Sequence, residues 1–266
     1  MKLFNTEALT LEKDGTTIDC AVFGKGSRPL VLIPGLSLQR VKGSALPLAY
    51  MYRIFSREFK VYVMDKKEDV PDGYTIRELA DDAAFVMEEL GLSAAAVFGV
   101  SQGGMIAQYL AIDHPRLVQR LVLGVTASRQ NDVMEAAVSG WVRMAEQRDY
   151  EAFMTDMFYK MYSAAYIRKY KWAFPLLSRV GKPKDFTRFI HLANACLTCD
   201  AYPELQKITC PTFVIGGKQD LVVTGRASEE IAAALHCKIH MYDTLGHAAY
   251  DEAPDFNQRI YQFLTE

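Results

Sequence analysis

The chain has 266 residues, of which 50% are hydrophobic and 23% are charged, and its formal net charge is −2 at pH 7. This length and composition suit one large globular domain, or a domain that carries an insertion, with a sizeable core. The small net charge argues against a nucleic-acid partner, no apolar run reaches the roughly 18 residues that stable membrane insertion would need, and the N-terminus has no signal-peptide pattern.

Cysteine usage predicts the compartment and the absence of a metal site. Five cysteines are scattered through the chain, and this odd number fits reduced thiols better than a disulfide framework. Cys196 and Cys199 form a C-x-x-C pair, but no second pair or histidine cluster accompanies them to complete a zinc site. We therefore expect a cytoplasmic protein with buried or incidental thiols, without a metal or an organic cofactor.

The first half of the chain alternates between strand and helix patterns. In chain order it predicts a hairpin over 6–23, a strand over 30–33, a helix over 46–59, a strand over 61–64, a helix over 75–90, a strand over 94–100, a helix over 104–112 and a strand over 120–125. The helix that begins at Thr75 has a clear start, because Glu78 completes a capping box, and Gly91 ends it. Strands separated by helices imply crossover connections and a parallel sheet.

The pattern changes between about residues 126 and 200. This stretch is helical in character and carries 12 of the 30 aromatic residues, including Trp141 and Trp172. Alternation then returns, with strands over 212–215 and 238–242 and helices over 227–235 and 255–264. We predict an α/β fold in which helices flank a mostly parallel central sheet of about eight strands, with residues 1–125 and 201–266 as the core and residues 126–200 as an inserted helical cap, or lid.

The segment Gly99-Val100-Ser101-Gln102-Gly103 fits G-x-S-x-G and lies where the predicted strand 94–100 gives way to the helix 104–112. A serine raised on so sharp a turn needs small neighbours, because the backbone folds close to itself there. The following helix also points backbone N–H groups at an oxyanion that forms beside the serine. The pattern therefore predicts Ser101 as a nucleophile.

A serine nucleophile needs a base within hydrogen-bond reach and an acid that orients the base. Asp220 follows the strand 212–215 and His247 follows the strand 238–242, so we expect both side chains at the C-terminal edge of the sheet. None of the other four histidines lies beyond the C-terminal end of a predicted strand. Asp243 remains an alternative acid.

Four further segments match a known family pattern. They are VLIPG (31–35), HPRLVQRLVL (114–123), CPTFVIGGKQD (210–220) and LGHAAYDEAPDFNQRIYQFL (245–264). With the serine motif and the order Ser, Asp, His along the chain, they make the sequence resemble the α/β-hydrolase fold superfamily along nearly its whole length. The resemblance implies Ser101 as nucleophile, His247 as general base and then acid, and Asp220 as orienting acid.

The oxyanion site of the family combines two backbone N–H groups. Here they would come from Gln102 and from Leu36, which lies in the loop after the strand 30–33. Two features depart from the family: Pro34-Gly35 stands where His-Gly is usual, and Asp65-Lys66-Lys67-Glu68-Asp69 replaces the usual Asp-x-Arg-Gly stretch. The backbone donor is intact, but how its loop is anchored stays open.

The cap is rich in side chains suited to an apolar pocket. Residues 150–174 carry nine aromatic residues and three methionines, which either line a substrate pocket or pack the cap onto the core, and packing is favoured for any single residue. The candidates for the pocket are Met154, Phe158, Tyr162 and Trp141. The four-residue spacing of Tyr162, Tyr166 and Tyr170 predicts a shared helix face.

The charge of the cap is uneven. Residues 160–188 hold eight basic residues and one acidic residue, so this segment carries +7 and the rest of the chain −9. The segment could attract anionic substrates, an acidic partner or an anionic membrane surface. The alternative, which we favour, is a solvated helix face whose charges are offset by acidic neighbours.

Together these features predict a cofactor-free serine hydrolase that acts through an acyl-enzyme on a small or medium carboxylic ester, thioester or lactone. A serine at this position disfavours the dehalogenase and epoxide-hydrolase chemistry of the family, which uses aspartate there. C–C bond hydrolysis, peptidase action and a non-hydrolytic small-molecule receptor remain alternatives. The expected partner is a small-molecule acyl substrate, and a homodimer is left open.

Overall fold

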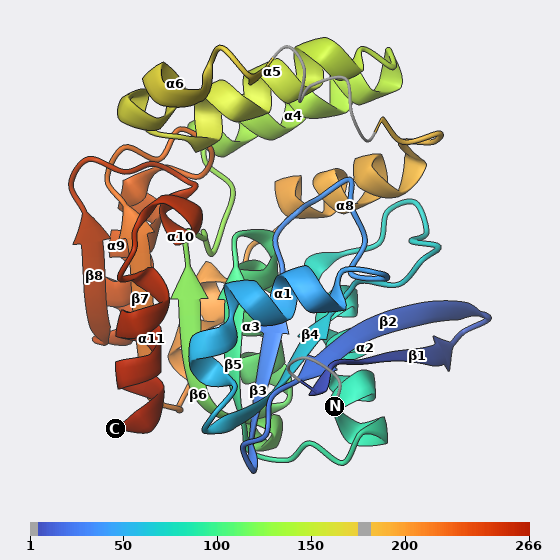
Figure 1. The fold of residues 1–266 in the computed structure, drawn as a ribbon, viewed down its shortest axis with the longest axis vertical. Coiled ribbons are helices and arrows are strands. Elements are labelled where there is room, and N and C mark those ends of the chain that lie inside the picture. The colour runs from blue at the N-terminus through green and yellow to red at the C-terminus, as the bar shows by residue number, and fades with distance from the viewer. Residues whose placement is uncertain (1–4, 175–181) are drawn as a thin grey trace.

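The computed structural model describes residues 5–174 and 182–266. Its centre is an eight-stranded sheet in the order β1-β2-β4-β3-β5-β6-β7-β8 (Figure 1). The strands are β1 (Glu7–Lys13), β2 (Thr16–Phe23), β3 (Arg28–Ile33), β4 (Phe59–Met64), β5 (Ala95–Val100), β6 (Val118–Gly124), β7 (Thr212–Gly217) and β8 (Lys238–Tyr242). The pairs β1–β2 and β2–β4 are antiparallel, and the other neighbouring pairs are parallel. The predicted α/β fold with a mostly parallel central sheet is confirmed.

Helices cover both faces of the sheet, which is why its inner strands are continuous apolar runs. The core helices are α1 (Ala45–Met51), α2 (Ile76–Glu89), α3 (Gln102–Asp113), α9 (Gly225–Leu235), α10 (Ala249–Glu252) and α11 (Phe256–Thr265). Successive side chains of a strand point to opposite faces. Along β3, Val31 and Ile33 join the apolar cluster of α2, α3 and α9, whereas Leu30 and Leu32 join that of α1 and α11.

Two helices show how far local sequence determined local structure. The Thr75 side chain accepts a hydrogen bond from the Glu78 N–H, and the Glu78 carboxylate accepts one from the Thr75 N–H, so the predicted capping box is present. The helix predicted over 46–59 is too long, because α1 ends at Met51 and a 3₁₀ turn follows. Its apolar pattern continues to Phe59 because the 3₁₀ turn and the first residue of β4 also bury their side chains.

The predicted cap stretch, in its described residues, is helical apart from an isolated bridge between Arg129 and Asp200. Its helices are α4 (Asp132–Glu146), α5 (Tyr150–Met161), α6 (Ala164–Tyr170) and α8 (Thr187–Leu197). Asn131, Asp149 and Ser163 cap the first three of them, each accepting a backbone hydrogen bond. Figure 1 shows α4, α5 and α6 as a layer at the end of the sheet to which the parallel strands point, with α8 packed beside α4.

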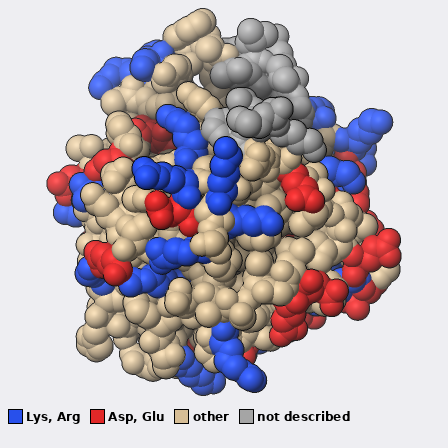
Figure 2. Space-filling view, turned by 60° about the horizontal axis from the view of Figure 1, so that its bottom comes forward, with Lys and Arg blue, Asp and Glu red and all other residues tan. Residues whose placement is uncertain are grey.

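Charges on the described surface are mixed. On the face shown in Figure 2, basic side chains gather near the middle, with acidic side chains among and around them. Within the basic segment 160–188, Lys160 pairs with Asp156 and Arg188 pairs with Asp65, so acidic neighbours offset both of these charges. Arg179 lies outside the described residues. No helix among residues 5–174 and 182–266 is long and apolar enough to cross a membrane.

Candidate active site

Ser101 occupies the turn between β5 and α3 in a backbone conformation that side chains rarely adopt. Its φ is 54° and its ψ is −121°, and such strain costs on the order of 1–3 kcal/mol. Two hydrogen bonds hold the turn: the Ser101 N–H donates to the Gly124 carbonyl at 2.8 Å, and the Thr126 hydroxyl donates to the Ser101 carbonyl at 2.7 Å. The serine is therefore fixed at the carboxyl end of a central strand.

The glycines of the motif are required by close backbone approach. A Cβ atom on Gly103 would lie 1.9 Å from the Ile33 carbonyl oxygen, and one on Gly99 would lie 2.3 Å from the Gly103 carbonyl oxygen. Neither separation is possible for a real side chain, so helix α3 can start this close to β3 and β5 only with glycine at both positions. The structure thus explains both glycines of G-x-S-x-G.

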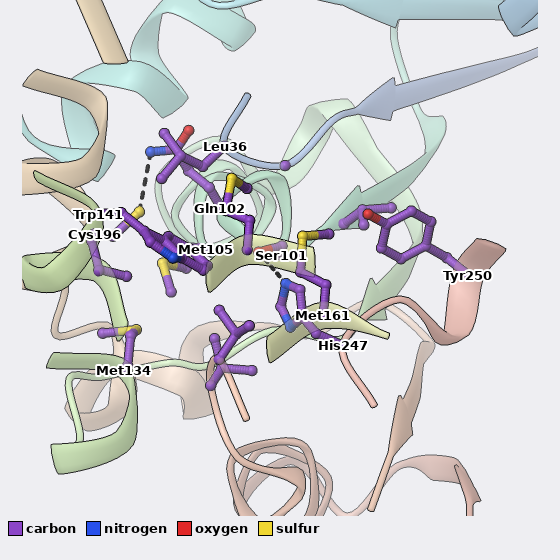
Figure 3. Close-up of a pocket in the computed structure, with 16 residues that line it drawn as sticks. Leu36, Ser101, Gln102, Met105, Met134, Trp141, Met161, Cys196, His247 and Tyr250 are labelled. Atoms are coloured by element: carbon purple, nitrogen blue, oxygen red, sulfur yellow. Dashed lines mark hydrogen bonds between the residues drawn. The ribbon is translucent and has the colours of Figure 1, made fainter. Parts of the chain in front are cut away.

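The structure brings the three predicted catalytic side chains together. His247 Nε2 lies 2.9 Å from Ser101 Oγ (Figure 3), and His247 Nδ1 lies 2.8 Å from Asp220 Oδ2. The carboxylate can only accept, so the neutral imidazole carries its proton on Nδ1 and its Nε2 accepts the serine proton. The carboxyl group is itself fixed, because Asp220 Oδ1 accepts the N–H groups of Val222 and Val223 at 2.7 and 2.9 Å.

The alternative residues lie elsewhere. Asp243 is exposed and pairs with Lys218 at 2.6 Å. His114 pairs with Asp81 at 2.9 Å, and the ring of His191 bonds to a backbone carbonyl in a loop of the core. His247 and Asp220, in contrast, are only 4% and 6% exposed.

The two predicted oxyanion donors border the same cavity as Ser101. Gln102 is the first residue of α3, and the first four N–H groups of a helix have no acceptor within that helix. Leu36 borders the same cavity from the loop after β3 (Figure 3). The arrangement can place two N–H groups beside an oxygen bound at the serine.

Two cavities of unequal size lie next to each other at this site, and Ser101 lines the inner one. The inner cavity has a volume of about 40 Å³ and an apolar wall formed by Met105, Met134, Val138, Trp141, Cys196, Val222 and Val223. The outer cavity has a volume of about 380 Å³, and its wall includes Leu38, Tyr52, Tyr150 and Met154. Leu36, Met161 and Tyr250 border both. In Figure 3, Trp141 and Met134 lie on one side of Ser101 and Tyr250 on the other.

The four predicted pocket residues border three different cavities. Trp141 borders the inner cavity and Met154 the outer one, whereas Phe158 and Tyr162 line a third cavity of about 290 Å³ that Met154 also borders. Phe158 stacks on Phe174 with ring centroids 4.4 Å apart, and the Tyr162 hydroxyl donates to Asp251 at 2.9 Å. These two side chains therefore combine packing contacts with a place in the wall of the third cavity.

The expected shared face of the three tyrosines is also interrupted. Helix α5 ends at Met161 and α6 begins at Ala164, so Tyr162 lies between two helices. Its ring nevertheless stacks on that of Tyr166, with centroids 4.3 Å apart.

Several residues of the inner cavity were not predicted. Met134 and Val138 come from α4, and nothing in their sequence marks them as facing the serine rather than the core. Val222 and Val223 lie two and three residues after Asp220, which is a signal that could have found them. Burial raises the pKa of the Cys196 thiol to about 12, so this side chain is part of an apolar wall and is not a second nucleophile. Among the described residues, no group of three or more His, Cys, Asp or Glu side chains converges on a possible metal site.

Comparisons with known proteins identify the family and support the fold. The alpha/beta hydrolase fold model matches residues 14–254. "Putative carbamate hydrolase RutD" of Serratia proteamaculans is 27% identical over 66% of this chain and 69% of its own, and 3-oxoadipate enol-lactonase 2 of Acinetobacter baylyi is 22% identical over 81% and 80%. The crystal structure of the enol-lactonase from Burkholderia xenovorans LB400 superposes with a TM-score of 0.84 at 22% identity, covering 97% of this chain and 100% of that one. The chain belongs to the α/β-hydrolase fold family.

Proposed function

We propose that the protein is a serine hydrolase that forms an acyl-enzyme on small carboxylic esters, thioesters or lactones. The observation that carries this proposal is the continuous hydrogen-bonded series from Asp220 through His247 to Ser101, beside two backbone N–H donors. Each member has the geometry that its role requires.

The reaction follows from these parts. Ser101 Oγ attacks the acyl carbon and gives its proton to His247 Nε2, while Asp220 stabilises the imidazolium that forms. The N–H groups of Leu36 and Gln102 hold the developing oxyanion, and loss of one such donor raises the barrier by on the order of 3 kcal/mol. The imidazolium then protonates the leaving group. Water activated by the same histidine hydrolyses the acyl-enzyme.

The two cavities favour a substrate with one short side and one longer side. The inner cavity, at about 40 Å³, admits only a small group. The 380 Å³ outer cavity admits a much larger group. We therefore expect one of two ester series to be strongly limited in length: either acyl esters of p-nitrophenol with growing acyl chains, or acetates of alcohols with growing chains.

A carbamate is the second candidate substrate. Beyond the acyl carbon and its oxygen, a carbamoyl group carries only an amino group, which suits the small inner cavity. The names of the relatives include both a carbamate hydrolase and an enol-lactonase, and both activities use attack on an acyl carbon. A lactone and a carbamate therefore belong in the substrate panel, together with a peptide and a β-diketone for the other two chemistries of this triad.

Labelling with a fluorophosphonate, followed by mass mapping, tests the mechanism. We expect a single adduct on Ser101, no adduct in Ser101→Ala, and steady release of p-nitrophenol from short acyl esters. A single burst without turnover would favour the receptor alternative. A label on another residue of active protein would refute the assignment of the nucleophile.

A further inference from the structure

The loop that carries Leu36 is anchored by a lysine that reaches it from the next strand. Lys66 follows β4 and is only 6% exposed. Its ammonium group donates to the carbonyl oxygen of Pro34 at 2.6 Å and to that of Gly35 at 2.7 Å. Within the described residues it makes no ion pair with a carboxylate, so its two polar contacts are both with this loop.

One of these contacts bears directly on the oxyanion site. The carbonyl of Gly35 and the N–H of Leu36 belong to the same peptide unit, and in a trans peptide these two groups point in opposite directions. No peptide bond of the described chain is cis. A hydrogen bond that holds the Gly35 oxygen toward Lys66 therefore turns the Leu36 N–H away from Lys66.

The loop also lies against the serine. A Cβ atom on Gly35 would lie 3.2 Å from the Cβ of Ser101 and 3.7 Å from its Oγ, so this peptide unit passes directly against the nucleophile. The Gly35 carbonyl is thus held by the ammonium group, while the Gly35 Cα lies beside the serine. A peptide that rotated about its neighbouring bonds would lose the Lys66 contact and would no longer present its N–H to the oxyanion.

We propose that Lys66 is the positioning residue of the oxyanion site: it fixes the Pro34–Gly35–Leu36 backbone so that the Leu36 N–H faces the oxygen of the reacting acyl group. This inference rests on the proposed serine-hydrolase function. It also answers how the loop is anchored in a chain that has Pro34-Gly35 in place of His-Gly.

The cap holds Lys66 in turn. Arg188 of α8 donates to the carbonyl oxygens of Lys66 and Lys67, each at 2.9 Å, and to Asp65 Oδ1 at 2.9 Å. The same helix also holds the other donor segment, because the side-chain amide of Gln102 donates to the Leu192 carbonyl at 2.6 Å. Both halves of the oxyanion site are therefore tied to α8.

The electrostatics of the site are consistent with a buried donor. Burial lowers the pKa of Lys66 to about 8; Asp65 and Cys196 oppose this lowering, and Arg188 adds to it. The amine keeps N–H groups for both carbonyls whether it is charged or neutral. The anchor therefore depends on the presence of the amino group and its reach more than on its charge.

Lys66→Met removes the donors while keeping an unbranched side chain. Lys67→Met is the matched control: Lys67 is 3% exposed, and its ammonium group lies 3.4 Å from Asp82 and 3.7 Å from Asp14, away from the loop. The readouts are kcat, KM and the affinity for an alkylboronic acid, whose tetrahedral serine adduct places an oxygen at the oxyanion site.

We expect Lys66→Met to lower kcat by about 10²-fold, the effect of losing one oxyanion donor, with KM changed by less than about threefold. Boronate affinity should fall by a similar factor as kcat. Lys67→Met should lower thermal stability and leave kcat and boronate affinity within about threefold. Should Lys66→Met not fold, Lys66→Gln, which keeps a neutral N–H donor, should show smaller losses of kcat and boronate affinity that match each other.

Two results would overturn the inference. One is a folded Lys66 variant whose boronate affinity stays within about threefold of wild type, and the other is an equal loss in Lys67→Met. Wild-type protein without turnover and without a label on Ser101 would instead count against the proposed function itself, so the two failures are distinguishable.

Discussion

Replacing Asp220 by asparagine tests the geometry of the candidate catalytic triad most sharply. Asp220 Oδ1 accepts two backbone N–H groups, from Val222 and Val223. An asparagine must therefore place its carbonyl oxygen at that position, because an NH₂ group there would oppose two donors. The NH₂ group then takes the place of Oδ2, 2.8 Å from His247 Nδ1.

This forced orientation reverses the tautomer of the histidine. An NH₂ group can only donate, so His247 Nδ1 becomes the acceptor and Nε2 carries the proton. Nε2 lies 2.9 Å from Ser101 Oγ and can no longer accept the serine proton. We expect kcat to fall about 10⁴-fold, as for asparagine at the acid position of other serine triads, which corresponds to about 5 kcal/mol of barrier. KM should change little.

Steady-state hydrolysis of p-nitrophenyl acetate measures the effect, with thermal unfolding as the check on folding. Asp243→Asn is the matched control, because Asp243 comes from the neighbouring loop, its side chain is 78% exposed and it pairs with Lys218. It should keep wild-type kcat. A folded Asp220→Asn variant within tenfold of wild type, or a large loss in Asp243→Asn, would refute the assignment of the acid.

Three further perturbations test the cavities, the turn and the buried lysine. Trp141→Ala should cost about 3–5 kcal/mol of stability and raise kcat/KM at least tenfold for longer members of the length-limited ester series; an unchanged length profile would contradict the inner-cavity assignment. Gly103→Ala, whose Cβ would lie 1.9 Å from the Ile33 oxygen, should abolish folding or labelling at the serine. The control is Gly140→Ala, whose Cβ would meet no neighbouring atom within 4 Å; it should raise the free energy of unfolding by roughly 0.5–1 kcal/mol. Similar shifts of the melting temperature in the two glycine variants would argue against the close approach of Gly103 to Ile33. Between about pH 8 and 10.5 the Lys66 side chain is protonated in the unfolded chain and deprotonated in the folded chain. As the pH rises through this range, the free energy of unfolding of wild type should therefore increase by up to about 3 kcal/mol relative to that of Lys66→Met. Urea unfolding at both ends of this pH range measures the difference in free energy of unfolding between the two proteins. A difference that grows on acidification would be inconsistent with the lowered pKa.

The residues of the candidate triad could be predicted because each comes directly after a strand. The carboxyl ends of parallel strands meet at one edge of the sheet, so Ser101, Asp220 and His247 needed only their strands to be recognised. The same reasoning does not identify pocket residues in the predicted cap, because helices have no common strand end that brings side chains together. Phe158 and Trp141 have similar surroundings in sequence, and only the packing of α4 and α5 decides that one borders the inner cavity and the other does not.

Lys66 shows a second limit of sequence reasoning. Its place after β4 was visible as a departure from the family pattern, but its two acceptors lie 31 and 32 residues earlier in the chain. Nothing local specifies that a lysine will turn inward and be buried there, since exposed lysine is the usual outcome. Only the shared edge of β3 and β4, which are parallel neighbours, brings the side chain to that loop.

The bridge between Arg129 and Asp200 brings the two ends of the predicted insertion side by side. A segment whose ends lie so close can be exchanged for another without rethreading the strands, and loops of this kind tolerate such replacement. Here a transplanted insertion would have to bring its own partners for Asp65 and for the Gln102 amide. The segment whose exchange would alter substrate binding therefore also supports the candidate active site. A chimera without partners for Asp65 and the Gln102 amide should bind new compounds but hydrolyse them poorly.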